Sequence, residues 1–299
     1  MAKLRRNHQA SKNASSTLMR FIAFIIVALG GMWYAWTQYQ GEGQPQYEKE
    51  SIVQDPASRS FLPSSTTGAI VHHMDYSLSY VEAHEQAEWV AYKLTRDNLR
   101  KPNVKRSKRF NPDYDVRTRS AFHRDYTGSG YTRGHLAPAG DMAHSQEAME
   151  ESFFMSNISP QLRGFNNGAW KELEETVRDW AFSDNELYVV TGPILTDRNM
   201  RKIGQNKVSV PARFYKILLD LEKPQEKAIA FIMPNGTLKE HLREYAVSID
   251  EVERATGIDF FADLLNDQEE EKLESSYDIN LWKFSDKRFR LRLEKWNNQ

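Results

Sequence analysis

The sequence predicts an α+β domain with a central, mostly antiparallel sheet flanked by helices, preceded by an N-terminal transmembrane helix. Short apolar runs separated by turn residues predict neighbouring antiparallel strands in the second half of the chain. Amphipathic runs between them predict helices. A charge-free run near the N-terminus predicts the membrane span. The chain has 299 residues, 40% of them hydrophobic, and this is enough to bury a sizeable core.

The N-terminal 40 residues have the pattern of a membrane anchor. Residues 1–20 are basic and contain no acid, and residues 21–40 contain no charged residue. About 20 apolar helical residues cross a bilayer, and basic residues before a span favour keeping that end in the cytoplasm. We therefore expect a chain anchored in a membrane through residues 21–40, with the folded part outside the cytoplasm, on the periplasmic side of a bacterial inner membrane. A cleaved secretion signal and a mitochondrial targeting segment are the alternatives.

The next segment, residues 41–66, is predicted to be a linker, because it is polar, contains proline and offers few residues for a core. The folded domain is expected over residues 67–299, with its first regular structure near Ala69.

Hydrophobic spacing predicts the individual elements. A helix is expected over residues 80–94, where apolar residues recur at intervals of three and four. Further helices are expected over residues 166–182 and 238–245. Strands are expected over residues 186–190, ending at the turn Gly192-Pro193, and over residues 207–210. Residues 213–220 and 228–233 are expected to form a strand pair joined by a turn at Lys223-Pro224.

Composition excludes some classes of chemistry and favours others. The chain has no cysteine, which excludes disulfides, cysteine-ligated zinc and thiol catalysis. The net charge of −1 says little, but charge is unevenly distributed. Residues 101–135 hold nine Lys and Arg against three Asp, whereas residues 250–278 hold 11 acids against two bases. A local basic strip suits a phosphate backbone, and the acidic segment is expected to be a solvated surface.

The segment from Tyr126 to Glu174 assembles the groups that phosphodiester hydrolysis needs. A neutral imidazole, here His135, accepts a proton from water near pH 7. Mg²⁺ takes hard oxygen ligands and few protein contacts, so the Asn166 amide oxygen is a sufficient ligand, with Glu174 holding metal-bound water. Mn²⁺ is an acceptable substitute. Arg133 is placed to contact the phosphate.

Local geometry supports this constellation. Gly134 permits a tight turn before His135, where a Cβ is expected to collide with phosphate or metal-bound water. Asn166 is expected to cap the helix that follows, with Glu174 two turns further along it, so that both border one cleft.

Two linked motifs resemble the signature of the DNA/RNA non-specific endonucleases. The first runs from Tyr126 to Ala139 and includes Thr132-Arg133-Gly134-His135; the second runs from Asn157 through Gln161 to Asn166 and Glu174. The resemblance covers approximately residues 70–235. It implies the ββα-metal (His-Me finger) nuclease fold, similar to that of mitochondrial endonuclease G.

The resemblance also implies a role for each residue. His135 matches the general base, Asn166 the magnesium ligand, and Glu174 the carboxylate that contacts metal-bound water. Arg133 matches a phosphate-contacting arginine, and Asn157 and Gln161 match supporting polar residues. A second, upstream arginine is expected at Arg106, with Arg109 as the alternative. Thr132 is a departure, because the family usually has Asp there; it keeps a hydroxyl but supplies no negative charge.

The sequence thus predicts a membrane-tethered, Mg²⁺-dependent endonuclease that cleaves DNA and RNA through backbone contacts, without sequence preference. One alternative is a nucleic-acid-binding homologue whose catalysis is weakened by Thr132. Another is a structural envelope protein. A homodimer is an open option, because endonuclease G relatives are dimers.

Overall fold

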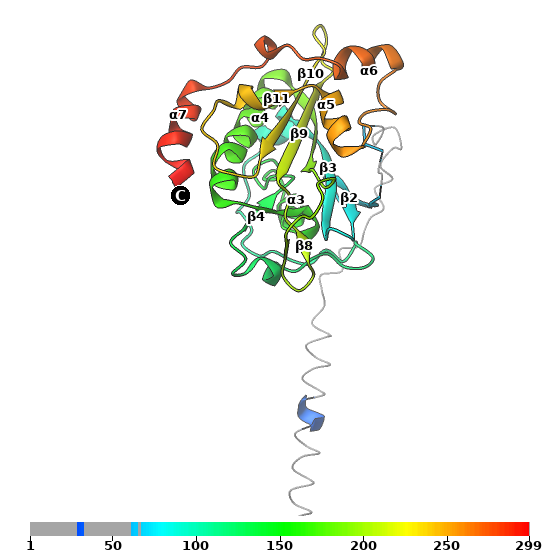
Figure 1. Cartoon of the computed structure of the whole chain (residues 1–299), viewed down its shortest axis with the longest axis vertical. Helices are drawn as coiled ribbons and strands as arrows, with labels where there is room; N and C mark the ends of the chain where they lie inside the picture. Colours follow the sequence, from blue (N-terminus) through cyan, green and yellow to red (C-terminus); the bar gives the residue numbers. More distant parts are fainter. Residues whose placement is uncertain (1–28, 33–60, 65–66, 299) are drawn as a thin grey trace, which may run out of the picture. The chain divides into compact units, whose positions relative to one another are not determined.

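A computed structural model describes residues 29–32, 61–64 and 67–298 of the chain (Figure 1). Residues 29–32 are helical, and the rest of the predicted span 21–40 lies outside the described residues. Among the described residues, no helix combines the length and apolar character needed to cross a bilayer. Most of the predicted linker also lies outside the described residues. The first strand begins at Ala69, as expected.

The domain is built on a seven-stranded sheet in which every neighbouring pair is antiparallel. The strands, in spatial order, are β1 (Ala69–His72), β2 (Ser77–Val81), β3 (Gln86–Thr95), β6 (Glu186–Pro193), β9 (Arg213–Asp220), β10 (Lys227–Pro234) and β11 (Ala246–Val247). The predicted α+β class with a mostly antiparallel sheet is therefore confirmed.

Side chains of the sheet alternate between two hydrophobic cores, one on each face. Val90 and Tyr92 of β3 belong to the core that includes Leu173 and Val177 of α4 (Lys171–Asp184). Trp89 and Ala91 of β3 belong to the opposite core, which includes residues of α5 (Ile249–Thr256) and α6 (Asp267–Glu274). Helix α4 thus covers one face of the sheet, and α5 and α6 cover the other (Figure 1).

Smaller elements complete the described part of the chain. Two short antiparallel pairs lie outside the main sheet: β4 (Thr132–His135) with β5 (Ile158–Gln161), and β7 (Lys202–Ile203) with β8 (Val208–Ser209). The remaining α-helices are α2 (Arg96–Arg100), α3 (Gln146–Glu151) and α7 (Asp286–Glu294). Short 3-10 turns are η2 (His123–Tyr126), η3 (Met155–Asn157), η5 (Leu242–Tyr245), η6 (Ile279–Leu281) and η7 (Trp296–Asn298), and η4 (Phe165–Trp170) is a π-helical segment.

One predicted element is wrong. Residues 80–94 form no helix but the end of β2, a turn and most of β3. All but two of the ten residues of β3 are buried, because this central strand is covered on both faces. Apolar residues at consecutive positions hide the two-residue alternation of a strand and imitate a helical spacing.

Other predictions need smaller corrections. The strand pair at 213–220 and 228–233 is confirmed as β9 and β10, joined through Lys223-Pro224. The strand at 186–190 is confirmed as β6, which extends to Pro193. The strand at 207–210 shortens to β8, and only a 3-10 turn over Leu242–Tyr245 occupies the helix expected at 238–245.

Candidate active site

The two sequence motifs meet in the small β4–β5 sheet and the helical segments that follow it. His135 pairs with Ile158 and Thr132 pairs with Gln161 across the two strands. The chain then enters η4, which carries Asn166, and continues into α4, which carries Glu174 in its first turn. Two strands followed by a helix therefore bring the first motif against the second.

The imidazole of His135 packs against two phenylalanine rings. Its ring centroid is 4.7 Å from that of Phe153, in an edge-on arrangement, and 5.6 Å from that of Phe110. The residue is 8% exposed, and Nε2 has no hydrogen-bond partner among the described residues. A buried imidazole nitrogen without a partner can accept a proton from a water or substrate group that reaches it.

Burial is the main cause that lowers the pKa of His135 to about 3, and the nearby charge of Arg106 lowers it further. The imidazole is therefore neutral at pH 7, as a general base must be. A phosphodiester anion bound beside it would favour the protonated form and raise this pKa, so the basicity of the group would rise when substrate arrives.

The depressed pKa predicts an acid-sensitive fold. An unfolded His titrates near 6.5, so below that pH the unfolded chain takes up a proton that the folded chain refuses. The neutral His135 imidazole therefore makes its full contribution to the free energy of unfolding above pH 6.5, and this contribution is lost as the pH falls towards about 3. When the pH falls from 7 to 5, the free energy of unfolding should decrease by about 2 kcal/mol more in the wild type than in His135→Gln. This follows from about 1.4 kcal/mol for each pH unit below 6.5. Urea unfolding at both pH values measures this, and equal losses in both proteins would contradict it.

Two arginines stand over the two phenylalanine rings that contact His135. The guanidinium carbon of Arg106 lies 5.2 Å from the ring centroid of Phe153, and that of Arg133 lies 5.5 Å from Phe110. Arg133 also donates to the backbone oxygen of His123 at 2.8 Å. The two guanidinium groups therefore lie over the two phenylalanine rings against which the imidazole packs. Of the two upstream candidates, Arg106 rather than Arg109 is the one that acts on His135.

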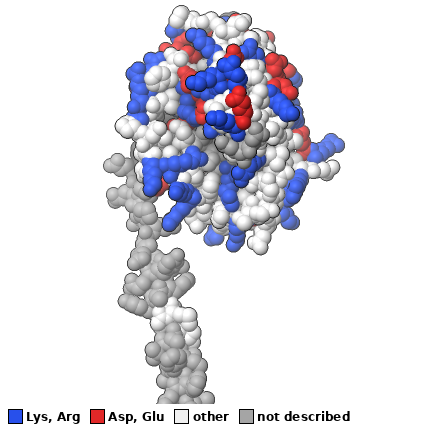
Figure 2. Space-filling model, turned by 90° about the vertical axis from the view of Figure 1, so that its left-hand side faces the viewer, with Lys and Arg blue, Asp and Glu red and all other residues white. Residues whose placement is uncertain are grey.

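Lysines and arginines are also abundant on the surface of this side of the domain. Figure 2 shows the side of the domain that carries α7, α4 and β4 in Figure 1. Basic side chains are spread over the lower half of the folded domain in this view, where few acidic side chains are visible.

The Asn166 amide is oriented by Thr132. The Thr132 hydroxyl donates to the backbone oxygen of Gln161 at 2.9 Å, so it has only lone pairs left for a second partner. That partner is Asn166 Nδ2, which donates to it at 2.9 Å. The hydrogen-bond pattern therefore fixes the amide nitrogen towards Thr132 and leaves Oδ1, a hard oxygen ligand, for a cation. Asn166 is not the helix cap expected from the sequence; it lies inside the π-helical segment.

Removing the Thr132 hydroxyl should therefore weaken metal binding. Thr132→Val keeps the shape of the side chain but removes the acceptor that holds Asn166 Nδ2. We expect the affinity for Mn²⁺, measured by isothermal titration calorimetry, to fall by roughly 10- to 100-fold, as for other outer partners of metal ligands. Thr132→Ser keeps the hydroxyl and should stay near the wild-type affinity. Equal affinities for the Val and Ser variants would show that the hydroxyl does not orient the ligand.

Asn157 fixes the backbone that follows His135. Its amide is fully buried, accepts from the Ala137 backbone nitrogen at 2.8 Å and donates to the Ala137 and Ser152 backbone oxygens at 2.9 and 2.8 Å. The Leu136 nitrogen also donates to the Asn157 backbone oxygen at 3.0 Å. This clamp holds the strand end that presents the imidazole.

Gln161 explains why position 134 is glycine. A Cβ added at Gly134 would lie 2.2 Å from the Gln161 side chain, closer than any real contact. The structure thus gives a packing reason for this glycine; the expectation that a Cβ here would collide with phosphate or metal-bound water stays a prediction. The Gln161 amide is itself buried, and both its polar atoms lack a hydrogen-bond partner among the described residues.

Glu174 lies in a network of charges that the sequence does not reveal. Burial raises its pKa, and the positive charges of Arg178, Lys216 and Arg106 oppose this effect. Arg178 is one turn beyond Glu174 on α4 and forms an ion pair with Asp141 at 2.8 Å. Lys216, on β9, is fully buried, with Nζ 5.0 Å from the ring centroid of Trp170.

Two features of the sequence indicate part of this charge network. Lys216 is the one charge inside the apolar run Phe214–Leu219, and a lysine is almost never fully buried without a partner charge. Arg178 follows Glu174 at the spacing that places two side chains on one helix face. No comparable feature of the sequence indicates that Phe110 and Phe153 lie against His135.

Comparison with known proteins agrees with this geometry. Residues 56–267 match the model of the DNA/RNA non-specific endonuclease family. The chain is 33% identical to "Nuclease EXOG, mitochondrial" of Danio rerio over 265 residues, covering 84% of this chain and 77% of that protein. It is 35% identical to "Endonuclease G, mitochondrial" of Homo sapiens over 206 residues, covering 64% of this chain and 68% of that protein.

A solved structure also matches. It is a complex of EndoG with EndoGI, with a TM-score of 0.65 and 32% sequence identity, and the match covers 71% of this chain and 91% of that one. Together, the motifs, the fold and these relatives show that the chain is a nuclease and belongs to the DNA/RNA non-specific endonuclease family.

Proposed function

We propose that this nuclease is a Mg²⁺-dependent endonuclease that hydrolyses phosphodiester bonds of both DNA and RNA, with His135 as general base and one cation held by Asn166. Two observations support the proposal. The Thr132–Asn166 hydrogen bond leaves the Asn166 Oδ1 oxygen for a cation. His135, on the same strand as Thr132, offers a neutral imidazole whose Nε2 has no partner among the described residues.

Each side chain of the site has a task in this proposal. His135 Nε2 takes the proton of the attacking water, while the adjacent rings of Phe110 and Phe153 limit the access of bulk water to the imidazole. Arg133 and Arg106 bind the phosphate oxygens and hold the scissile group against His135. A bound cation would stabilise negative charge on the phosphate and the leaving oxygen. Glu174 would accept hydrogen bonds from water held by that cation, and Mn²⁺ would substitute for Mg²⁺.

Substrate contacts are expected to be to the backbone. The two arginines beside His135 are placed to contact phosphate oxygens, and phosphate contacts carry no direct sequence information. The nuclease should therefore cut many sequences, and its activity should fall as salt rises.

A plasmid assay tests the proposal. Supercoiled DNA and a structured RNA should both be cleaved with Mg²⁺ or Mn²⁺, and EDTA should stop both reactions. Undiminished cleavage in EDTA would refute the metal dependence. Binding of both polynucleotides without any nicking would instead favour the alternative, a homologue weakened by Thr132, and failure to bind either at low salt would favour a structural protein.

The location of the nuclease is part of the proposal. Residues 21–40 are proposed as a membrane anchor, because they are free of charge and follow a basic segment. The mitochondrial names of the relatives support the alternative of a mitochondrial targeting segment. A fusion of residues 1–40 to a fluorescent protein distinguishes them: an anchored fusion stays with membranes after carbonate extraction, whereas a targeting segment is cleaved. A homodimer, as in endonuclease G relatives, remains part of the same proposal, and light scattering tests it.

A further inference from the structure

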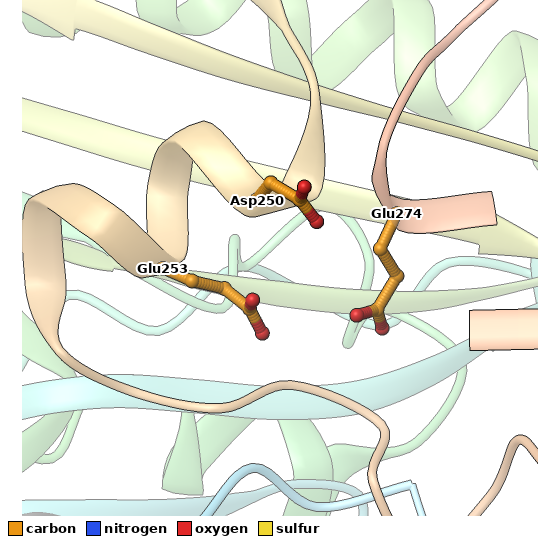
Figure 3. Close-up of side chains that lie close together, drawn as sticks. All are labelled: Asp250, Glu253 and Glu274. Atoms are coloured by element: carbon orange, nitrogen blue, oxygen red, sulfur yellow. The ribbon is translucent and has the colours of Figure 1, made fainter. Parts of the chain in front are cut away.

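Three carboxylates meet on the face of the sheet opposite α4. Asp250 and Glu253 lie three residues apart on α5, and Glu274 is the last residue of α6 (Figure 3). One oxygen from each side chain lies within 4.8 Å of the oxygens of the other two. Two oxygens that share one Ca²⁺ at about 2.4 Å lie at most about 4.8 Å apart, so small side-chain movements would bring these three around a single ion.

The Glu274 carboxyl is the unusual member of this cluster. The residue is 2% exposed, and its Oε1 has no hydrogen-bond partner among the described residues. It points towards the other two carboxylates (Figure 3). A buried oxygen without a partner is costly, and a negative charge at the C-terminal end of a helix adds to that cost.

The surrounding charges increase the demand for a cation. The negative charges of Glu253, Glu270, Asp259 and Asp250 all act on the buried Glu274 carboxyl. A cation bound among these carboxylates would relieve their mutual repulsion. The Glu253 carboxylate is already oriented, because its Oε1 accepts from the Phe260 backbone nitrogen at 2.9 Å. Asp250 and Glu253 are partly exposed, so water can reach an ion and complete its shell.

We propose that Asp250, Glu253 and Glu274 bind a Ca²⁺ ion that is separate from the active-site cation and ties α5 to α6. Ca²⁺ fits better than Mg²⁺, because it accepts six to eight oxygen ligands in flexible geometry, whereas Mg²⁺ demands a near-ideal octahedron and releases its waters reluctantly. Both helices pack on β10 and belong to the same hydrophobic core, so the ion would stabilise that face of the domain.

The test uses full-length protein carrying Asn166→Ala, which removes the proposed active-site ligand and leaves the acidic cluster intact. After EDTA treatment and dialysis, Ca²⁺ should bind with a stoichiometry of one per chain by isothermal titration calorimetry. At a hundredfold excess over Kd, it should raise Tm by about 5 °C or more. Mg²⁺ should give a smaller shift. An equal shift with Mg²⁺ would overturn the choice of Ca²⁺.

Two variants and a matched control locate the ion. Glu274→Gln and Asp250→Asn, each added to Asn166→Ala, should weaken Ca²⁺ binding by roughly a hundredfold or more, because even outer partners of a metal site contribute roughly 10- to 100-fold. Glu271→Gln removes an exposed carboxylate of the same helix outside the cluster and should keep the full response. If Glu274→Gln fails to fold, Asp250→Asn still tests the proposal, because the Asp250 side chain is partly exposed and its replacement should leave the fold intact. No Tm shift in the parent protein, or an undiminished shift in the cluster variants, would overturn the proposal.

Discussion

Replacing His135 by alanine should lower the rate of plasmid cleavage by about 100- to 10,000-fold, the range typical for loss of a general base. The expected cause is chemical rather than structural. His135 offers the nitrogen Nε2, which has no partner among the described residues, and its low pKa keeps that nitrogen unprotonated at pH 7. Single-turnover cleavage of a supercoiled plasmid measures the effect without interference from product release.

The control for this variant is His241→Ala. His241 stacks on Phe289 of α7, with ring centroids 3.5 Å apart, and has no place in the proposed chemistry. Its replacement should leave cleavage within a few-fold of wild type. In His135→Ala, the affinity for Mn²⁺ should be unchanged, because the imidazole is not a proposed ligand. Cleavage by His135→Ala at the wild-type rate would remove the imidazole from the mechanism.

Replacing Asn166 by alanine should abolish both metal binding at the active site and cleavage. A single protein ligand holds the proposed cation, so its removal leaves only contacts through water. We expect the loss of activity to match or exceed that of His135→Ala, and raised Mg²⁺ should restore little of it. Titration of Mn²⁺ by electron paramagnetic resonance measures the binding directly.

Asn167→Ala is a matched control, because it removes the same amide one position further along the π-helical segment. It should retain the active-site Mn²⁺ and most of the activity. The two variants together separate the ligand from the fold of the segment. Wild-type Mn²⁺ affinity in Asn166→Ala would show that the cation is held elsewhere.

The sequence predicted those parts of the fold whose patterns are local. Strands β9 and β10 are long apolar runs on either side of a proline turn, and this local pattern predicts an antiparallel strand pair. The segment from Gln86 to Thr95 was misassigned, since burial on both faces removes the alternation that identifies a strand. Its pairing with β2 and β6 depends on residues distant in sequence, which no local pattern contains.

The site was predictable where the family motifs name residues and not where tertiary packing selects them. The motifs identified His135 and Asn166, but the regular-helix argument for Asn166 and Glu174 does not hold, because η4 is π-helical and is kinked at Gly168. The structure supplies what spacing cannot show: Thr132 orients the Asn166 amide, and Lys216 reaches the Glu174 network from β9.

A crystal of His135→Ala soaked with Mn²⁺ and a short oligonucleotide tests the central claim most directly. The variant should hold its substrate uncleaved, and anomalous scattering locates the cation. We expect Mn²⁺ on Asn166 Oδ1, in contact with a phosphate whose opposite side faces the position of the missing imidazole. A cation bound away from Asn166, or a scissile phosphate out of reach of position 135, would contradict it.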